Sequence, residues 1–287
     1  MKYRHRFHAG NFADVHKHVT LFALLSALKR KEKGFLYLDT HAGGGGYDLS
    51  RPSAEATAGI GRFAPAADAA PELGGYAALL EQCRAALARP QLYPGSPLLA
   101  IAALRAQDRA VLIEREAAEA RALTGLVERS RKARLGASPR PHVERGDGYA
   151  RLRGWLPPPE RRALTFLDPP YEERREDFLA VLSALGEGLR RFGTGVFAAW
   201  YPIKDERTTN AWQLECARSL AAPLLVSELW LYPRDARVAL NGSGMLIVNP
   251  PWRTLERMQV WLPQLHGCLA VGGEGGSSAR MLREWPA

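Results

Sequence analysis

The chain has 287 residues, 46% hydrophobic and 24% charged, which is enough to bury a sizeable core as one large domain or one domain with an insertion. No apolar run is long enough to span a bilayer, and the basic N-terminal stretch lacks a signal core, so we expect a cytoplasmic protein. The net charge of +9 favours a polyanionic partner such as nucleic acid. The three cysteines are far apart and lack metal spacing, which argues against a disulfide framework or a cysteine zinc site.

Residues 1–30 are predicted to form a basic arm that leads into an apolar-periodic segment over residues 15–28. Four of the seven histidines fall in this arm. No carboxylate–histidine pattern of a known zinc site accompanies them, so we expect no metal there. We expect the arm to pack beside a ligand instead.

A strand is predicted at residues 35–39, and it runs directly into Thr40, His41 and the glycines 43–46. Glycines after a strand allow positive φ angles and close approach of the backbone to a ligand, as in nucleotide-binding first turns. The loop lacks both the Lys-Ser/Thr of a P-loop and the GxGxxG spacing of a dinucleotide site. A merely flexible turn is the alternative.

Residues 47–92 are rich in alanine, glycine and proline and lack the strand–helix alternation of their flanks. We interpret them as an inserted helical subdomain, with a helix over residues 76–88, within a main domain of residues 1–46 and 93–270. After the insertion, the run Tyr93–Pro97 predicts a turn with Ser96 as helix N-cap and Pro97 at the first helical position.

Regular alternation follows the insertion. Strands are predicted at residues 110–114, 142–144, 164–168, 194–200, 224–232 and 244–248, and helices at residues 117–134, 149–154, 177–192 and 206–220. With the first strand this gives seven strands separated mostly by helices, the pattern of a doubly wound, mainly parallel α/β sheet. No helix is evident between the last two strands, so the final one is predicted to run antiparallel. Residues 271–287 are predicted to be a loose tail.

Acidic residues mark the ends of the first three strands. The first strand ends at Asp39, directly before the glycine loop. The second strand ends at Glu114, and Asp147 lies just past the third. A carboxylate after the second strand has two acceptor oxygens at the spacing of ribose hydroxyls, a role that suits Glu114, with Glu116 as a competitor. Asp147 is suited to accept from an adenine amino group while Gly148 allows close backbone approach. Ordinary capping or an Asp-Gly turn would explain the same residues.

The fourth strand ends in Asp168-Pro169-Pro170-Tyr171. Two prolines cannot continue a sheet ladder or a helix, so the chain leaves the strand just after Asp168. The exocyclic amine of a base is a poor nucleophile, but Asp168 and the Pro169 carbonyl can each accept one of its N–H groups while Tyr171 stacks on the ring. The amine can then attack a methyl group on a sulfonium, provided that the base is flipped or unpaired. The alternative is a plain turn with an exposed acid.

A second run of this form is Asn249-Pro250-Pro251-Trp252. It follows the last strand, which in the usual winding lies away from the cofactor crevice, whereas Asp168 follows the strand next to the switch point. We therefore assign catalysis to Asp168 and interpret Asn249 as part of a structural turn or a substrate-side contact.

The chain resembles the RlmJ family of bacterial 23S ribosomal RNA adenine-N6 methyltransferases. The matching stretches are YRHRFHAGNFADVHKH, FLYLDTHAGGGGY, YPGSP, LTFLDPPY, AWYP and GSGMLIVNPPW. The resemblance implies a class I, Rossmann-like methyltransferase fold with a small helical insertion, S-adenosylmethionine as cofactor and 23S ribosomal RNA as partner. It weakens over residues 51–92 and 272–287, which leaves the substrate fit and the role of the tail open.

The resemblance also implies roles for individual residues. The cofactor contacts that it implies are His18, His41, Ser96, Glu114, Asp147 and Gly148. Asp168 is implied as the active-site acid, and Tyr3 and Lys17 as neighbours of cofactor and substrate. Arg115 follows Glu114, so the match at the ribose acid rests on position more than on a motif.

Two alternatives to this function remain. A DNA adenine-N6 methyltransferase would use the same residues, although no separate target-recognition domain is visible. An RNA-binding protein with a non-catalytic methyltransferase fold would share the basic charge but bind no cofactor, and the intact acids Glu114, Asp147 and Asp168 argue against it. We expect a monomer without an obligate protein partner.

Overall fold

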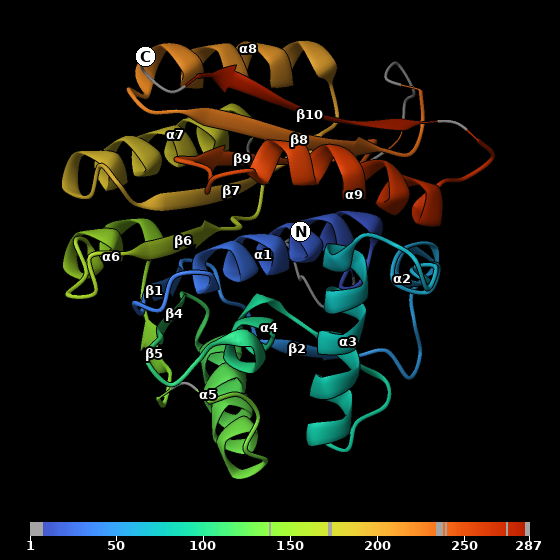
Figure 1. Cartoon of the computed structure of the whole chain (residues 1–287), viewed down its shortest axis with the longest axis vertical. Coiled ribbons are helices and arrows are strands. Elements are labelled where there is room, and N and C mark those ends of the chain that lie inside the picture. The colour runs from blue at the N-terminus through green and yellow to red at the C-terminus, as the bar shows by residue number, and fades with distance from the viewer. Residues whose placement is uncertain are drawn as a thin grey trace.

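The computed structural model describes residues 8–137, 139–171, 174–233, 238, 240–273 and 275–284. In this part of the chain one eight-stranded sheet carries helices on both faces (Figure 1). From top to bottom of the figure its strands are β10 (Gly276–Arg283), β8 (Leu224–Trp230), β9 (Gly242–Val248), β7 (Val196–Ile203), β6 (Ala163–Leu167), β1 (Leu36–Asp39), β4 (Arg109–Glu114) and β5 (His142–Arg145). None of the helices within these ranges has both the length and the apolar character needed to cross a membrane.

Two hydrophobic cores cover the two faces of the sheet. One is formed with α1 (Phe12–Lys29), α4 (Ser96–Ala103), α5 (Ala117–Lys132) and α9 (Thr254–Leu269), and the other with α6 (Gly148–Trp155), α7 (Arg174–Arg191) and α8 (Glu206–Ser219). Because both faces are covered, the central parallel strands β1 and β6 are buried along their whole length, and their sequences are mostly apolar rather than alternating. This explains why they could be recognised as short apolar runs.

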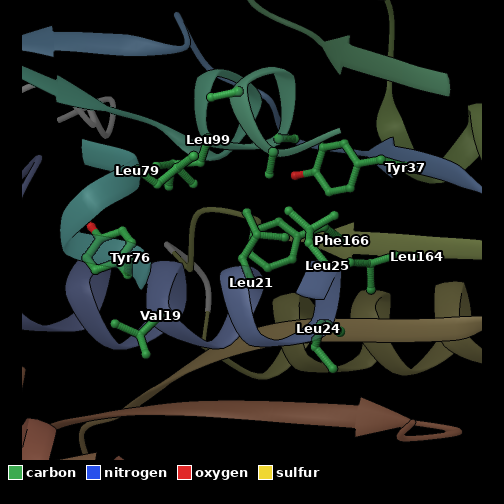
Figure 2. Close-up of a cluster of buried hydrophobic side chains, with 14 of the residues drawn as sticks. Val19, Leu21, Leu24, Leu25, Tyr37, Tyr76, Leu79, Leu99, Leu164 and Phe166 are labelled. Atoms are coloured by element: carbon green, nitrogen blue, oxygen red, sulfur yellow. The ribbon is translucent and has the colours of Figure 1, made fainter. Parts of the chain in front are cut away.

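Helix α1 passes across the sheet beside the strand ends that matter for function. Figure 2 shows Leu21 and Leu25 of α1 next to Phe166 of β6, with Tyr37 of β1 close by, and all four side chains are fully buried. Each such side chain contributes about 1.5–3 kcal/mol relative to an exposed one. The helix is therefore fixed rigidly against β1 and β6.

The order of strands places a topological switch point at β1. This strand pairs in parallel with β6 on one side and with β4 on the other, and β5 follows β4. At such a point the loops after the strands diverge and leave a crevice at the carboxyl ends, where ligands of open α/β sheets bind. The predicted site residues at the ends of β1, β4, β5 and β6 therefore share one edge.

The doubly wound, mainly parallel fold is confirmed, and so is the antiparallel direction of β9, which pairs with β7 and β8. The predictions of seven strands and of a loose tail were wrong, because Gly276–Arg283 forms β10 and pairs antiparallel with β8. Side chains of this strand pack on both faces, with Met281 against one core and Leu282 against the other. Two-sided burial explains why a Gly/Ser-rich segment is ordered as an edge strand.

The inserted segment forms α2 (Ala54–Ala58) and α3 (Pro71–Ala86), which Figure 1 shows together at one side of the molecule. Its ends meet in a two-stranded antiparallel sheet of β2 (Gly46–Asp48) and β3 (Leu92–Pro94). Helix α3 starts earlier than predicted, with Pro71 in its first turn, where a missing N–H does no harm. The insertion packs against the same core as α1 and α4.

His16 joins α1 to the antiparallel part of the sheet. Its Nδ1 lies 2.9 Å from Ser243 Oγ on β9, and its Nε2 lies 2.9 Å from Ser227 Oγ on β8. All three side chains are fully buried. Burial lowers the pKa of His16 to about 3, so the ring is neutral at physiological pH.

This burial makes stability depend on pH. Below pH 6.5 the histidine takes up a proton in the unfolded chain but not in the folded one, so the free energy of unfolding should fall by about 1.4 kcal/mol per pH unit for His16 alone. Urea denaturation of the wild type and of His16→Gln between pH 7 and 5 measures the difference. The variant should lose stability less steeply, and parallel curves would contradict the assignment.

Candidate active site

Asp168 follows the last residue of β6, and Pro169 and Pro170 turn the chain away from the sheet immediately after it. Its side chain is 15% exposed, and its Oδ2 lies 2.5 Å from Lys17 Nζ. An acid predicted from the strand pattern is thus held at the sheet edge by a cation from α1, so it has a fixed orientation but keeps access to the crevice.

Lys17 bridges two carboxylates. Its Nζ lies 2.8 Å from Asp14 Oδ1 as well as 2.5 Å from Asp168 Oδ2. Burial alone would lower the pKa of Lys17, but the two carboxylates outweigh that effect and raise the pKa above its usual value. The ammonium group therefore stays charged and partly neutralises the two acids.

Asp14 was not predicted as a site residue. It is 3% exposed, and its Oδ2 accepts a hydrogen bond from the Gly10 backbone N–H at 2.9 Å. Asn11 caps the helix by accepting from the Asp14 N–H. The only sequence signal for Asp14 was its spacing three residues before Lys17, which places the two on one face of a helix.

Tyr171 lies on the opposite face of the sheet from Lys17, packed with the α7 and α8 core. Its hydroxyl donates to the Trp200 carbonyl at 2.7 Å, and its ring centroid lies 4.9 Å from that of Phe178 and 5.5 Å from that of Trp200. Strand β7 continues through Ile203, past its last pairing with β6 at Ala199, and so forms a wall beside the turn. Stacking of Tyr171 on a base stays a prediction.

Trp200 is a second residue that sequence reasoning left without a role, although it belongs to the AWYP stretch. Its Nε1 donates to Ser243 Oγ at 3.0 Å, and Lys17 Nζ lies 5.5 Å from the centre of its ring. Because Ser243 also contacts His16, one hydrogen-bonded chain links Trp200 to α1. The turn, β7 and α1 are thereby positioned relative to one another.

At the end of β1, Asp39 is fully buried and accepts from three donors. Tyr37 Oη lies 2.8 Å and Ser96 Oγ 2.7 Å from its Oδ2, and the His41 backbone N–H donates to Oδ1 at 3.2 Å. Burial raises the pKa of Asp39 to about 6. The prediction of Ser96 as an N-cap was wrong: Gly95 is the N-cap of α4, and the Ser96 hydroxyl is used by Asp39 instead.

The loop after β1 brings His41 and the glycines to the crevice. Gly43 and Gly45 have φ angles of +58° and +79°, a conformation that favours glycine. The His41 ring meets Tyr149 edge-on at 4.9 Å, and its Nδ1 lies 2.8 Å from Thr40 Oγ1. Burial lowers the pKa of His41 to about 4, so the ring is neutral at pH 7.

Glu114 at the end of β4 is fixed by two backbone donors. Its Oε2 accepts from the Gly43 N–H and its Oε1 from the Glu116 N–H, both at 2.7 Å. Burial raises the pKa of Glu114, although these bonds oppose the effect. Each oxygen keeps a second lone pair, which fits a pair of ribose hydroxyls. Glu116, the competitor in sequence, is the N-cap of α5.

Asp147 and Gly148 stand at the start of α6. Asp147 is the N-cap of this helix: its Oδ1 accepts from the Ala150 N–H at 3.1 Å, and its Oδ2 lies 3.8 Å from the exposed Arg115 guanidinium. Gly148 is packed directly under the loop after β1, because a Cβ there would lie 2.0 Å from the Thr40 carbonyl oxygen. The two loops can approach this closely only with glycine.

Replacing Gly148 with alanine should therefore force β1 and α6 apart, cost about 1–3 kcal/mol of stability and weaken cofactor binding. Calorimetric titration with S-adenosylmethionine and urea denaturation measure both effects. Gly154 in the same helix is the matched control, since a Cβ there meets nothing within 4 Å. If Gly148→Ala behaves like Gly154→Ala, the close approach does not matter.

Three predicted site residues remain: His18, Tyr3 and Pro169. His18 is buried on α1, with its Nδ1 2.8 Å from Tyr93 Oη of the YPGSP stretch. Tyr3 lies outside the described residues. Pro169 is buried directly after Asp168. The structure therefore gathers His41, Ser96, Glu114, Asp147, Gly148, Lys17 and Asp168 around the strand ends.

Asn249 lies at the other end of the sheet. Strand β9 runs antiparallel to β7, with Val248 opposite Phe197, so its last residues face the amino end of the parallel strands. The Asn249 backbone is left-handed, with φ +51°, and its side-chain amide donates to the carbonyls of Gly193 and Gly195. These bonds give the second Pro-Pro run a structural role as a turn.

The residues at this edge of the sheet are of the kinds that hold a nucleoside. Glu114 offers acceptors for a diol, the positive-φ glycines allow close backbone approach, and acids lie at the ends of four strands, β1, β4, β5 and β6. Adjacent strands lie about 4.8 Å apart, so the ends of β4 and β6 are separated by about 10 Å across β1. That separation leaves room for a ligand between the ribose acid and Asp168. This fold and this site together define a Rossmann-like methyltransferase.

Comparisons with known proteins agree with this class of protein. A family model described as "Ribosomal RNA large subunit methyltransferase D, RlmJ" matches residues 32–285. Proteins named ribosomal RNA large subunit methyltransferase J from Escherichia coli and Haemophilus influenzae are 38% and 36% identical over 279 residues, 96% of this chain and 96% of theirs. A crystal structure of a Legionella pneumophila protein has a TM-score of 0.82 at 32% identity, covering 96% of this chain and 97% of its own. The chain belongs to the RlmJ family.

Proposed function

We propose that this protein transfers the methyl group of S-adenosylmethionine to the N6 amine of an adenine in 23S ribosomal RNA. The observation that carries the proposal is the position of the Asp168 carboxylate. Lys17 holds it at the end of β6, and β6 pairs with β1, the strand whose following loop lines the nucleoside crevice. The names of the curated relatives support the choice of large-subunit ribosomal RNA.

In this proposal Glu114 binds the ribose hydroxyls and Asp147 accepts from the adenine amino group of the cofactor. Gly148 keeps the two loops close, and His18, His41 and Ser96 shape the crevice. Bound S-adenosylmethionine supplies an electrophilic methyl group on a sulfonium. The neutral His41 ring adds no positive charge beside that cation.

The residues of the turn prepare the amine. Asp168 and the Pro169 carbonyl each accept one N–H, which draws the lone pair out of the ring and towards the methyl group. Tyr171 stacks on the base. Lys17 holds the Asp168 carboxylate in place and balances its charge when the base displaces water. The new N–C bond replaces the bond of the methyl carbon to sulfur, and the amine gives up one proton along its hydrogen bond to the Asp168 carboxylate.

The substrate adenine must be unpaired or flipped, because the turn lies inside a crevice that a base within a helix cannot reach. The basic charge of the chain suits binding to the ribosomal RNA backbone. We further propose that the protein acts in the cytoplasm as a monomer.

Incubation with labelled S-adenosylmethionine and either unmodified 23S ribosomal RNA or DNA tests the reaction. Label should enter the RNA as N6-methyladenine, and transfer to DNA alone would favour the DNA enzyme. Calorimetric titration with S-adenosylmethionine excludes a non-catalytic RNA-binding protein if heat of binding is seen. Mass-spectrometric mapping of RNA from cells with and without the protein then identifies the adenine.

A further inference from the structure

A cavity of about 320 Å³ opens at the catalytic edge of the sheet, on the side of α7 and α8. Its walls include the side chains of Tyr171, Phe178, Pro202, Lys204, Thr208 and Thr209. It lies beyond the end of β7, beside the Pro-Pro turn. The proposed reaction uses Tyr171 but leaves the cavity unassigned.

The walls combine aromatic rings with a cation and hydroxyl groups. Tyr171 and Phe178 form the apolar side, and the exposed Lys204 ammonium has no ion-pair partner among the residues that the structure describes. Asp205 also lines the cavity, but its Oδ2 accepts from the Thr208 backbone N–H at 2.8 Å and from Thr208 Oγ1 at 2.5 Å. That carboxylate is thus engaged with its own helix, and Lys204 is left to meet an anion.

We propose that this cavity binds the nucleotide adjacent to the target adenine, with its base against the Tyr171 and Phe178 side and its phosphate at Lys204. The proposal rests on the proposed function and adds a determinant of substrate sequence to it. A single nucleotide matches a volume at the lower end of the range for ligand pockets. Unpaired RNA is recognised by this combination of aromatic surfaces and basic groups.

Distance supports the choice of a neighbouring nucleotide. Tyr171 follows Asp168 by three residues, so the two Cα atoms are at most about 11 Å apart. Asp168 itself does not line the cavity, and its carboxylate contacts Lys17 of α1, across the sheet from α7 and α8. The target adenine and the cavity therefore need different bases of one strand, and Tyr171 stands between them.

Filling the cavity tests the proposal. Thr208 is exposed in the first turn of α8, and Thr208→Tyr keeps the backbone N–H that the Asp205 cap uses. We expect the variant to lose roughly tenfold in kcat/KM for RNA through a raised KM, with unchanged affinity for S-adenosylmethionine. Thr208→Ala, which removes the hydroxyl without filling the space, is the matched control. An unchanged kcat/KM in Thr208→Tyr, or a lowered kcat with unchanged KM, would overturn the proposal, since the latter places the target base itself in the cavity.

The phosphate contact has its own measurement. In Lys204→Ala the slope of log affinity for single-stranded ribosomal RNA against log salt concentration should shrink by about 0.7–1. Lys33, exposed just before β1 at the opposite edge of the sheet, is the matched control, and Lys33→Ala should leave the slope unchanged. Equal slopes in wild type and Lys204→Ala would refute the contact.

Experiments with RNA fragments distinguish a failure of the cavity proposal from a failure of the proposed function. Once the methylated adenine is mapped, an abasic residue on one side of it should raise KM roughly tenfold in the wild type and add little in Thr208→Tyr. Insensitivity to abasic residues on both sides would overturn the proposal while methyl transfer persists. If the wild type methylates no ribosomal RNA, the proposed function fails, and the salt slope of RNA binding still reports on the cavity.

Discussion

Replacing Asp168 with alanine should slow methyl transfer by about two to three orders of magnitude while S-adenosylmethionine still binds. The expected loss follows from the chemistry of the amine, whose lone pair remains in the aromatic ring unless acceptors hold its N–H groups. Single-turnover transfer of labelled methyl to 23S ribosomal RNA measures the rate, and calorimetry measures cofactor affinity. The loss should fall on kcat rather than on the KM for either substrate.

Asp168→Asn is the informative companion. Its amide keeps one acceptor oxygen but loses the charge that pairs with Lys17, so its rate should lie between those of the wild type and the alanine variant. Both variants should fold, because Lys17 retains its contact with Asp14. Full activity of Asp168→Ala would show that Asp168 has no part in methyl transfer.

The sequence predicted this acid because its signal is local. A short apolar strand that ends in Asp-Pro-Pro fixes where the chain must leave the sheet, and the order of strands fixes which edge it leaves from. Glu114 and Asp147 were predictable in the same way, since Glu114 ends β4 and Asp147 lies two residues after β5, both in the parallel part of the sheet. Their positions at one edge follow from parallel pairing alone.

Contacts between distant segments could not be predicted in this way. Lys17 and Asp168 are 151 positions apart, and no periodicity or spacing relates them. The contact exists because the apolar face of α1 packs over β1 and β6, which brings the polar first turns of the helix to the strand ends. Only the family resemblance pointed to Lys17. For Asp14 the spacing from Lys17 was the sole signal, and nothing pointed to Trp200 as a neighbour of that lysine.

Edge strand β10 shows the second limit. Composition marked its segment as a loose tail, because glycine and serine are poor strand formers. What orders it is the row of unpaired backbone groups on β8, together with Met281 and Leu282, whose burial depends on surfaces made by the rest of the chain. Local propensity therefore failed where tertiary context determined the structure.

The largest effect on stability is expected for Lys17→Met. The substitution removes a buried cation and leaves the Asp14 and Asp168 carboxylates without the charge that bridges them. Breaking a buried pair in this way costs about 3–5 kcal/mol. Urea denaturation at pH 7 measures the loss, and methyl transfer should fall as well because Asp168 is no longer oriented.

Two further variants separate charge from packing. Lys29 lies on the same helix, and among the described residues its Nζ donates to the Ala103 carbonyl, so Lys29→Met should cost about 1 kcal/mol. Asp14→Asn combined with Lys17→Met should recover part of the lost stability, because one of the two carboxylates that Lys17 bridged no longer carries a charge. Equal losses in Lys17→Met and Lys29→Met would show that the bridge between the two acids contributes little. A double variant less stable than Lys17→Met would show that the Gly10 hydrogen bond to Asp14, rather than its charge, holds the start of α1.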